Sequence, residues 1–316
     1  CDPIPDATGF DKSFELVMLE RAKAVWEAND GPIAVSWSGG IDSTGVLVAL
    51  LRTAGQGDLD RLTVYYTSGW GLSSVSEYPL FFENFVDEKL NNQEMRLDND
   101  LLNNGPIQMF DAVIRNRLVE VAENSLLVTG EFGDQLFGSA TFATRPDRIP
   151  MSSAEFLEHP DRSFYRPYMD EIRALNEKSP IDTTKLVDML WWWNFAVKWN
   201  EIAFRATIAA KQSSTLKNFH HFYQHEDFQK WSINNPHLKV GKTAESYKFT
   251  LKDFIYDYTK DADYRDKKTK VGSLRVRIGR IAAIDNKFNI IKFGNTSTNP
   301  DLMRQKYGDN LQRFVK

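Results

Sequence analysis

Residues 33–53, IAVSWSGGIDSTGVLVALLRT, decide the fold class of this chain. The first five residues form a short apolar run with β-branched side chains, which predicts a buried strand. Ser38-Gly39-Gly40 then ends the run, and an apolar pattern with helical spacing covers residues 42–53. Either Asp42 or Ser43 is well placed to cap that helix. The segment therefore predicts a strand, a glycine turn and a helix in immediate succession.

The same alternation of elements continues through the first half of the chain. Helices are expected at 9–28, 78–90 and 106–123, and further strands at 61–68, 94–98 and 125–131. This order predicts an α/β fold in which a parallel sheet carries helices on both faces.

The pattern changes near residue 145, where a stretch containing Pro and Ser interrupts it. No strand pattern follows for a long stretch, and residues 182–210 and 244–258 show helical spacing. Alternating apolar and polar residues predict a β-hairpin late in the chain, with strands within 274–284 and 287–293. We therefore expect an α/β core at 1–147 and a mainly helical part at 148–316 that packs on it.

The composition is that of an ordinary globular protein. The chain has 316 residues, 42% hydrophobic and 26% charged, with a formal net charge of −4. The acidic balance disfavours a nucleic-acid partner. No apolar run approaches the ~20 residues that a membrane span needs, and no signal-peptide pattern opens the chain, so we expect a cytoplasmic protein. The single cysteine, Cys1, excludes an internal disulfide and a CxxC zinc site.

The turn at residues 38–43 has the chemistry of a phosphate-binding loop. Glycines allow a tight turn whose N–H groups face an anion, and the N-terminus of the following helix adds its positive dipole end. The hydroxyls of Ser38 and Ser43 can donate to the same phosphates. Asp42 repels a phosphate unless Mg²⁺ lies between them. The loop lacks the GK[ST] ending of a Walker A motif.

These residues resemble the SGGxDS signature of the PP-loop ATP pyrophosphatases, whose fold is of the adenine nucleotide α-hydrolase type. The resemblance implies that ATP is cleaved between its α- and β-phosphates, with release of pyrophosphate and formation of an adenylated intermediate. It also implies that Asp42 holds Mg²⁺ and that the nucleotide is bound by Ser38, Gly39, Gly40, Asp42 and Ser43.

A second motif narrows the family. Residues 128–138, VTGEFGDQLFG, resemble the SGEGSDELFGG segment of asparagine synthetases and β-lactam synthetases. Ligands of open α/β sheets bind beyond the carboxyl ends of the strands, so both motifs should face one crevice. The resemblance implies that Asp134 is the second Mg²⁺ carboxylate, that Glu131 lies near the reacting carbonyl, and that Gly130 lines the nucleotide site. Two residues depart from the pattern: Phe132 replaces a small residue and Gln135 replaces a glutamate.

A third segment, Tyr264-Arg265-Asp266-Lys267-Lys268, resembles the R-x-K segment of asparagine synthetases, although the phenylalanine that usually follows is absent. The resemblance implies that Lys267 completes the active site, whereas a mixed charge run is also typical of a solvated loop. The loop at 38–43 comes too early to leave room for a glutaminase domain. Ammonia or an amine would then come from solution, from a separate glutaminase subunit or from the substrate.

These resemblances imply an ATP-dependent, AMP-forming ligase. It would adenylate a small carboxylate substrate and form an amide with ammonia or an amine, with catalytic roles for Glu131 and Lys267. One alternative is a tRNA- or nucleobase-modifying PP-loop enzyme, although its sulfur-inserting members usually need internal cysteines. The other alternative is a non-catalytic nucleotide-binding subunit, which Phe132 and Gln135 suggest.

Two further patterns could indicate ligand sites, but we interpret both as structural features. His221 and His225, next to His220, have the i, i+4 spacing of a helical metal site, but no third ligand is evident. Trp191-Trp192-Trp193 and Trp199 could stack on a base. Three consecutive side chains cannot all face one ligand, so we expect these tryptophans in an aromatic core.

Overall fold

The computed structural model describes residues 4–69, 72–96, 117–138, 150–159, 169–209, 215, 217–241, 243, 246–268, 282–285 and 290–293. The chain divides into two compact units, Cys1–Thr269 and Lys270–Lys316. The first unit contains the α/β elements and the helices that follow them, and the second contains a β-hairpin. The boundary expected at residue 147 stays a prediction.

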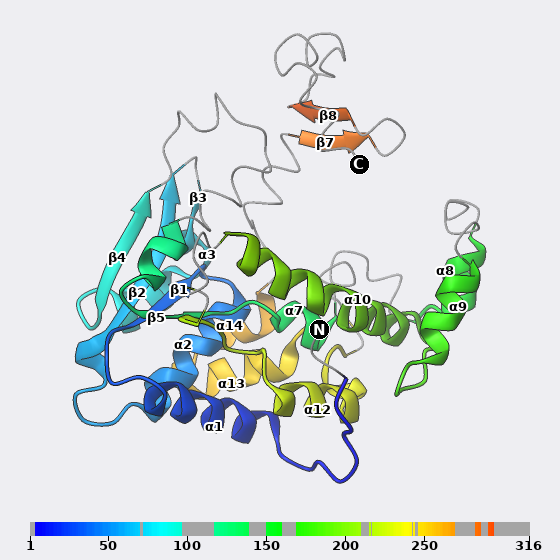
Figure 1. Ribbon diagram of the computed structural model, residues 1–316, viewed down its shortest axis with the longest axis horizontal. Helices are drawn as coiled ribbons and strands as arrows, with labels where there is room; N and C mark the ends of the chain where they lie inside the picture. Colours follow the sequence, from blue (N-terminus) through cyan, green and yellow to red (C-terminus); the bar gives the residue numbers. More distant parts are fainter. Residues whose placement is uncertain are drawn as a thin grey trace. The chain divides into compact units, whose positions relative to one another are not determined.

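The first unit is built on a parallel sheet, which confirms the predicted α/β class (Figure 1). Its parallel strands lie in the order β4-β2-β1-β5-β6. Their bounds are β1 (Ile33–Trp37), β2 (Leu62–Gly69), β4 (Asn91–Arg96), β5 (Leu126–Thr129) and β6 (Phe219–His221). The short strand β3 (Leu72–Ser73) pairs antiparallel with the end of β2.

Strand β1 is central because its side chains are apolar on both faces of the sheet. It pairs with β2 on one side and with β5 on the other. Ile33 and Val35 join the main core, whereas Ala34 packs with Leu127 and Ala122 in a second cluster. Ala122 belongs to a helical segment, 117–122. Helices therefore cover both faces of the sheet, as the sequence predicts.

The helices on the main-core face lie side by side in Figure 1. They are α1 (Phe14–Glu27), α2 (Ile41–Thr53), α12 (Glu226–Asn234) and α13 (Phe249–Thr259). Helix α1 begins at Ser13, whose hydroxyl accepts the N–H of Leu16 at 3.1 Å, the usual N-cap bond. Buried aromatic side chains fill the space between these helices, among them Phe14, Trp231 and Phe254.

Two predicted helices differ in detail. The helix expected at 78–90 is a series of short turns: α3 (Ser74–Glu77), α4 (Pro79–Phe81) and the π-helical turn η2 (Phe82–Val86). Pro79 has no N–H and begins a new turn, as proline does at the start of helices. Of the helix expected at 106–123, residues 117–122 are helical and 106–116 lie outside the described residues. Two single 3₁₀ turns, η1 (Leu59–Arg61) and η5 (Pro236–Leu238), connect other elements.

The later part of the first unit is mainly helical. Its remaining helices are α7 (Gly133–Phe137), α8 (Ser153–Glu158), α9 (Met169–Glu177), α10 (Leu186–Ala209) and α14 (Ala262–Lys267). The stretch also contains a strand for which the sequence shows no pattern, because β6 adds an edge strand beside β5. Its three residues, Phe-His-His, are too few to show a period in the sequence.

The tryptophans of α10 lie in the core, as expected. Trp191, Trp192 and Trp199 are buried, and the ring of Phe195 makes tilted contacts with those of Trp191 and Trp199. Trp193 is partly buried and packs against the same core. Among the residues that the structure describes, no helix combines the length and apolar character needed to cross a bilayer. The second unit holds the predicted hairpin, in which β7 (Ala282–Asp285) pairs antiparallel with β8 (Ile290–Phe293).

Candidate functional site

The loop after β1 is held in its turn by its own serines. The backbone N–H of Ser38 donates to Ser43 Oγ at 3.0 Å, and the two hydroxyls are 3.0 Å apart. Helix α2 begins after Gly40 and has no side-chain cap. The expectation that Asp42 or Ser43 caps it is therefore wrong, because Ser43 Oγ is bonded within the loop and Asp42 points to other partners.

Gly39 is required by both conformation and space. Its φ is +71°, in the left-handed region that favours glycine. A Cβ at this position would lie 2.1 Å from the carbonyl oxygen of Ser74 and 2.6 Å from Glu77 Cβ. The phosphate-binding loop expected from the sequence is thus packed directly against α3.

The second motif approaches the first at two glycines. A Cβ on Gly130 would lie 2.7 Å from the backbone nitrogen of Ser43, and one on Gly133 would lie 2.3 Å from Asp42 Oδ1. Both positions follow β5, the neighbour of β1 in the sheet. The close approach explains why glycine is needed at these positions, and it places the two predicted motifs in contact.

The two predicted metal carboxylates meet at a lysine. Lys248 Nζ lies 2.6 Å from each carboxylate oxygen of Asp42 and 2.7 Å from Asp134 Oδ1. The Lys248 side chain is 3% exposed, while those of Asp42 and Asp134 are 24% and 40% exposed. Burial acts to lower the pKa of Lys248, but attraction to Asp134 and Asp42 outweighs it and the pKa is raised. The ammonium group therefore stays charged and joins the two carboxylates.

Two tyrosines fix this cluster, which we call the Asp42–Asp134–Lys248 cluster. The Tyr247 hydroxyl donates to Asp134 Oδ1 at 3.2 Å and also to the carbonyl of Gly138. The Tyr223 hydroxyl donates to the backbone carbonyl of Asp42 at 3.0 Å. Burial, followed by the charges of nearby carboxylates, raises the pKa of both phenols well above its ordinary value, so both remain donors.

Glu131 lies two residues after the end of β5, and its side chain is 37% exposed. Its Oε2 is 3.8 Å from His221 Nδ1, and its backbone N–H donates to Thr129 Oγ1 at 3.4 Å.

The i, i+4 histidine pattern does not lie on one helix. His221 ends β6, and His225 is the N-cap of α12. Within the described ranges, no group of three or more His, Cys, Asp or Glu side chains is placed to hold a metal.

Phe132 is buried in a backbone conformation that suits glycine. Its φ is +73°, and its ring lies 4.6 Å from that of Trp199 and 5.3 Å from that of His221, measured between centroids. A bulky residue in the left-handed region is a genuine outlier and costs about 1–3 kcal/mol. Gln135, the other departure from the family pattern, is buried and donates to Asn194 Oδ1 at 3.4 Å.

The structure does not place Lys267 in the cluster. Lys267 lies in the last turn of α14, 73% exposed, and pairs with Asp263 one helical turn earlier. Its neighbour Lys268 is 8% exposed and donates to the carboxylate of Glu77 at 2.8 Å. Since Glu77 contacts Gly39, Lys268 lies closer to the first loop than the sequence suggests. Of these two lysines, the one expected in the active site is therefore exposed, and its neighbour is buried.

The sequence shows little that would have identified Lys248. The residue begins α13, in the left-handed conformation with φ +59°, between Tyr247 and Phe249. A lysine between two aromatic residues at the start of a helix is a weak sign of burial. No motif connects it with Asp42, 206 positions earlier.

The donor set of the cluster fits a magnesium ion. Mg²⁺ is usually bound by one or two protein carboxylates together with substrate phosphates and water. Asp42 and Asp134 already converge on a single cationic atom, and both keep part of their surface exposed. These two residues could hold Mg²⁺ if Lys248 turns toward an added anion.

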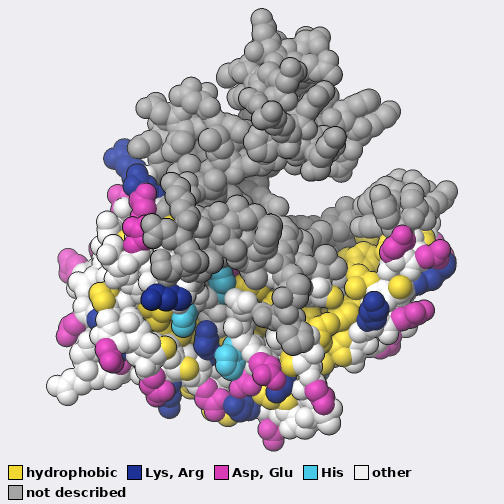
Figure 2. All heavy atoms as spheres, viewed as in Figure 1, with side chains coloured by type: hydrophobic (Ala, Val, Ile, Leu, Met, Phe, Trp, Pro, Cys, Tyr) yellow, Lys and Arg dark blue, Asp and Glu magenta, His cyan; other side chains and the backbone are white. Residues whose placement is uncertain are grey.

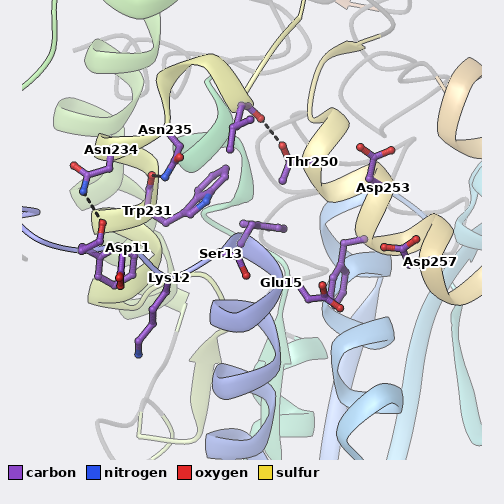
Figure 3. Close-up of a pocket in the computed structure, with 14 residues that line it drawn as sticks. Asp11, Lys12, Ser13, Glu15, Trp231, Asn234, Asn235, Thr250, Asp253 and Asp257 are labelled. Atoms are coloured by element: carbon purple, nitrogen blue, oxygen red, sulfur yellow. Dashed lines mark hydrogen bonds between the residues drawn. The ribbon is translucent and has the colours of Figure 1, made fainter.

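A separate pocket of about 500 Å³ lies between the segment before α1, the end of α12 and α13 (Figure 3). Asp11, Glu15, Asp253 and Asp257 contribute carboxylates to its wall, and Trp231 contributes an aromatic face. No residue of the loops at 38–43 or 128–138 lines it. This pocket is therefore not part of the cluster.

Charges of both signs are mixed on the described part of the face in Figure 2, where Asp and Glu side chains lie among Lys and Arg side chains.

No protein-family model and no curated protein was found to match this chain.

Proposed function

We propose that this protein is an ATP-dependent, AMP-forming ligase that adenylates a small carboxylate and joins it to ammonia or an amine. One observation carries the proposal: Asp42 and Asp134, taken from two separate motifs, converge on Lys248 Nζ. They do so beyond the carboxyl ends of the neighbouring strands β1 and β5, where open α/β sheets bind their ligands.

The loop at 38–43 binds the phosphates of ATP. The N–H groups of the first turn of a helix have no intrahelical acceptor and carry a partial positive charge, so the start of α2 attracts an anion. Gly39 gives the turn its shape, and the paired hydroxyls of Ser38 and Ser43 can exchange their mutual bond for bonds to phosphate. Gly130 packs on the backbone of Ser43 and so lines the phosphate site next to that residue.

Asp42 and Asp134 would hold Mg²⁺, which supplies charge neutralisation for the departing pyrophosphate. Lys248 would then pair with phosphate oxygens rather than with both carboxylates. It thereby takes the role that the sequence suggested for Lys267. A buried ammonium fixed beside the reacting phosphate stabilises the charge that develops there without reorganisation.

Glu131 acts in the second half of the reaction. The amine nitrogen attacks the carbonyl carbon of the acyl-adenylate, AMP leaves with the bonding electron pair, and Glu131 accepts the proton that the nitrogen loses. Its side chain is 37% exposed, which leaves part of it open to a substrate, although Oε2 itself is buried. A separate glutaminase subunit could supply the ammonia, and a reaction that consumes ATP is consistent with a cytoplasmic protein.

The products of ATP turnover test the proposal. The protein is incubated with ATP, Mg²⁺, ammonium and a panel of carboxylic acids, and the nucleotides are identified by mass spectrometry. AMP and pyrophosphate are expected, and ADP as the main product would overturn the proposal. Asp42→Asn and Asp134→Asn should each abolish turnover, whereas Asp263→Asn, at the exposed pair with Lys267, should leave it unchanged.

A nucleotide-binding subunit without turnover is the second candidate. The ammonium of Lys248 already pairs with both carboxylates, and Phe132 and Gln135 occupy positions that differ from the synthetase pattern. ATP binding measured by calorimetry, with no pyrophosphate release for any carboxylic acid, would favour this candidate. The tRNA-modifying alternative finds no support in the net charge of −4.

A further inference from the structure

We infer that His221 is a positioning residue that holds the carboxylate of Glu131 in place for proton transfer. The inference rests on the proposed function, which gives Glu131 its role as proton acceptor. It adds a residue that neither the motifs nor their resemblance to synthetases indicated.

The geometry connects His221 with Glu131 in two ways. Directly, His221 Nδ1 lies 3.8 Å from Glu131 Oε2. Indirectly, His221 Nδ1 is 2.7 Å from Thr129 Oγ1, and that same oxygen accepts the backbone N–H of Glu131. The Thr129 hydroxyl thus joins the imidazole of His221 to the backbone of Glu131, and the same imidazole faces the Glu131 side chain.

The sheet makes this arrangement rigid. Thr129 and His221 are the last residues of β5 and β6, and they are paired in the parallel register. The His221 side chain is 6% exposed, and its ring packs against Phe132 and Phe219. An imidazole held between a strand neighbour and two aromatic rings has little freedom to rotate, so it can define the position of a partly exposed carboxylate.

Electrostatics favour a proton on Nδ1. A lone pair on Nδ1 would face the negative Oε2 at 3.8 Å, whereas an N–H at the same place attracts it. The Nδ1–H then donates to Thr129 Oγ1 and turns its positive edge toward Glu131. Residues that orient a metal ligand through a hydrogen bond contribute about 10- to 100-fold to affinity or activity, and we expect an effect of this size here.

Three variants separate positioning from packing. Asn places its amide nitrogen where Nδ1 lies in histidine, and Gln places it where Nε2 lies. His221→Asn should therefore keep most of the effect, and His221→Gln should lose it. Thr129→Val keeps the volume of the side chain but removes the hydroxyl. His220→Asn is the matched control, because His220 precedes His221 on the same short strand and alternate residues of a strand face opposite sides.

The kinetic test compares two nucleophiles, ammonium and hydroxylamine, with the best carboxylic acid of the panel. Ammonium must lose one proton before its nitrogen can attack and a second one afterwards, whereas hydroxylamine is unprotonated at neutral pH and loses only the second. Hydroxylamine should therefore depend less on Glu131. His221→Gln and Thr129→Val should lower kcat with ammonium about 10- to 100-fold, with a smaller loss for hydroxylamine and little change in KM for ATP. His221→Asn should recover most of the rate. Equal losses with both nucleophiles, or no recovery with Asn, would overturn the inference.

A spectroscopic measurement keeps the test independent of turnover. The ¹⁵N resonances of the His221 ring should report a proton on Nδ1, and Glu131→Gln should shift them while leaving those of His220 in place. Unchanged His221 resonances would overturn the inference even if the enzyme is active. A shift without pyrophosphate release for any carboxylic acid would support the contact between His221 and Glu131 and contradict the proposed function.

Discussion

Lys248 and Asp42 are 206 positions apart in the sequence, yet Lys248 Nζ lies 2.6 Å from each carboxylate oxygen of Asp42. The same nitrogen reaches Asp134, so one buried ammonium joins two carboxylates that would otherwise repel each other. A charge buried in this way is tolerated only when it is paired, because the loss of hydration must be offset. This contact joins the start of α13 to both loops of the candidate site.

Replacing Lys248 by Met should destabilise the protein and make its stability depend on magnesium. Removing one partner of a buried ion pair costs about 3–5 kcal/mol, and the partial exposure of Asp42 and Asp134 should reduce this cost. Without the ammonium, Mg²⁺ can occupy the space between the carboxylates. Thermal unfolding without nucleotide should therefore show that Mg²⁺ raises the Tm of Lys248→Met more than that of the wild type. An equal response of the two proteins would contradict a shared cation site.

Gly39→Ala should cost much more stability than Gly57→Ala. Both glycines have positive φ, +71° and +83°, so each substitution costs about 1–2 kcal/mol from backbone conformation alone. A Cβ on Gly57 meets nothing within 4 Å, whereas one on Gly39 lies 2.1 Å from the Ser74 carbonyl oxygen. Urea unfolding of the two variants measures the difference. Gly39→Ala should also lose ATP binding in calorimetry, and similar behaviour of the two variants would argue against the tight packing of the loop.

Phe132 offers a test of backbone strain. Truncation of a buried Phe costs about 3–5 kcal/mol through the lost packing, and the ring here is 1% exposed. Substitution of a residue by glycine usually destabilises a protein more than substitution by alanine. At φ +73°, however, only glycine is unstrained. Phe132→Gly should therefore be more stable than Phe132→Ala, by up to about 1 kcal/mol. Denaturant unfolding of both variants shows which one is more stable. A more stable Phe132→Ala would mean that the backbone at Phe132 is not strained.

Lys268→Ala should have a larger effect than Lys267→Ala. Lys267 is 73% exposed and pairs with Asp263, so its loss should change the free energy of unfolding by at most ~0.5 kcal/mol and leave turnover intact. Lys268 is 8% exposed, and its removal leaves the Glu77 carboxylate, 15% exposed, without its ammonium partner. We expect a loss of about 1–3 kcal/mol for this variant. A large loss of turnover in Lys267→Ala alone would restore the catalytic role suggested by the R-x-K segment.

Local sequence patterns predicted the elements that carry the first loop. The strand at 33–37 and the helix after it form as expected, because a short apolar run and a helical period are properties of neighbouring residues. The same holds for the second motif, in which Gly130 and Gly133 prove to be positions where a side chain would collide with α2. The capping of α2 was not predictable, since Ser43 could bond either to the helix or to the loop.

The sequence by itself determined the α/β class, the position of the two loops at the carboxyl ends of strands, and the pair of acidic residues within them. Only the tertiary structure decided which cation joins those residues, Lys248 rather than Lys267, and which histidine faces Glu131. Periodicity and turn chemistry act over a few residues. A contact between positions 42 and 248 depends on how α13 packs against α2, which is set by the burial of side chains throughout the core.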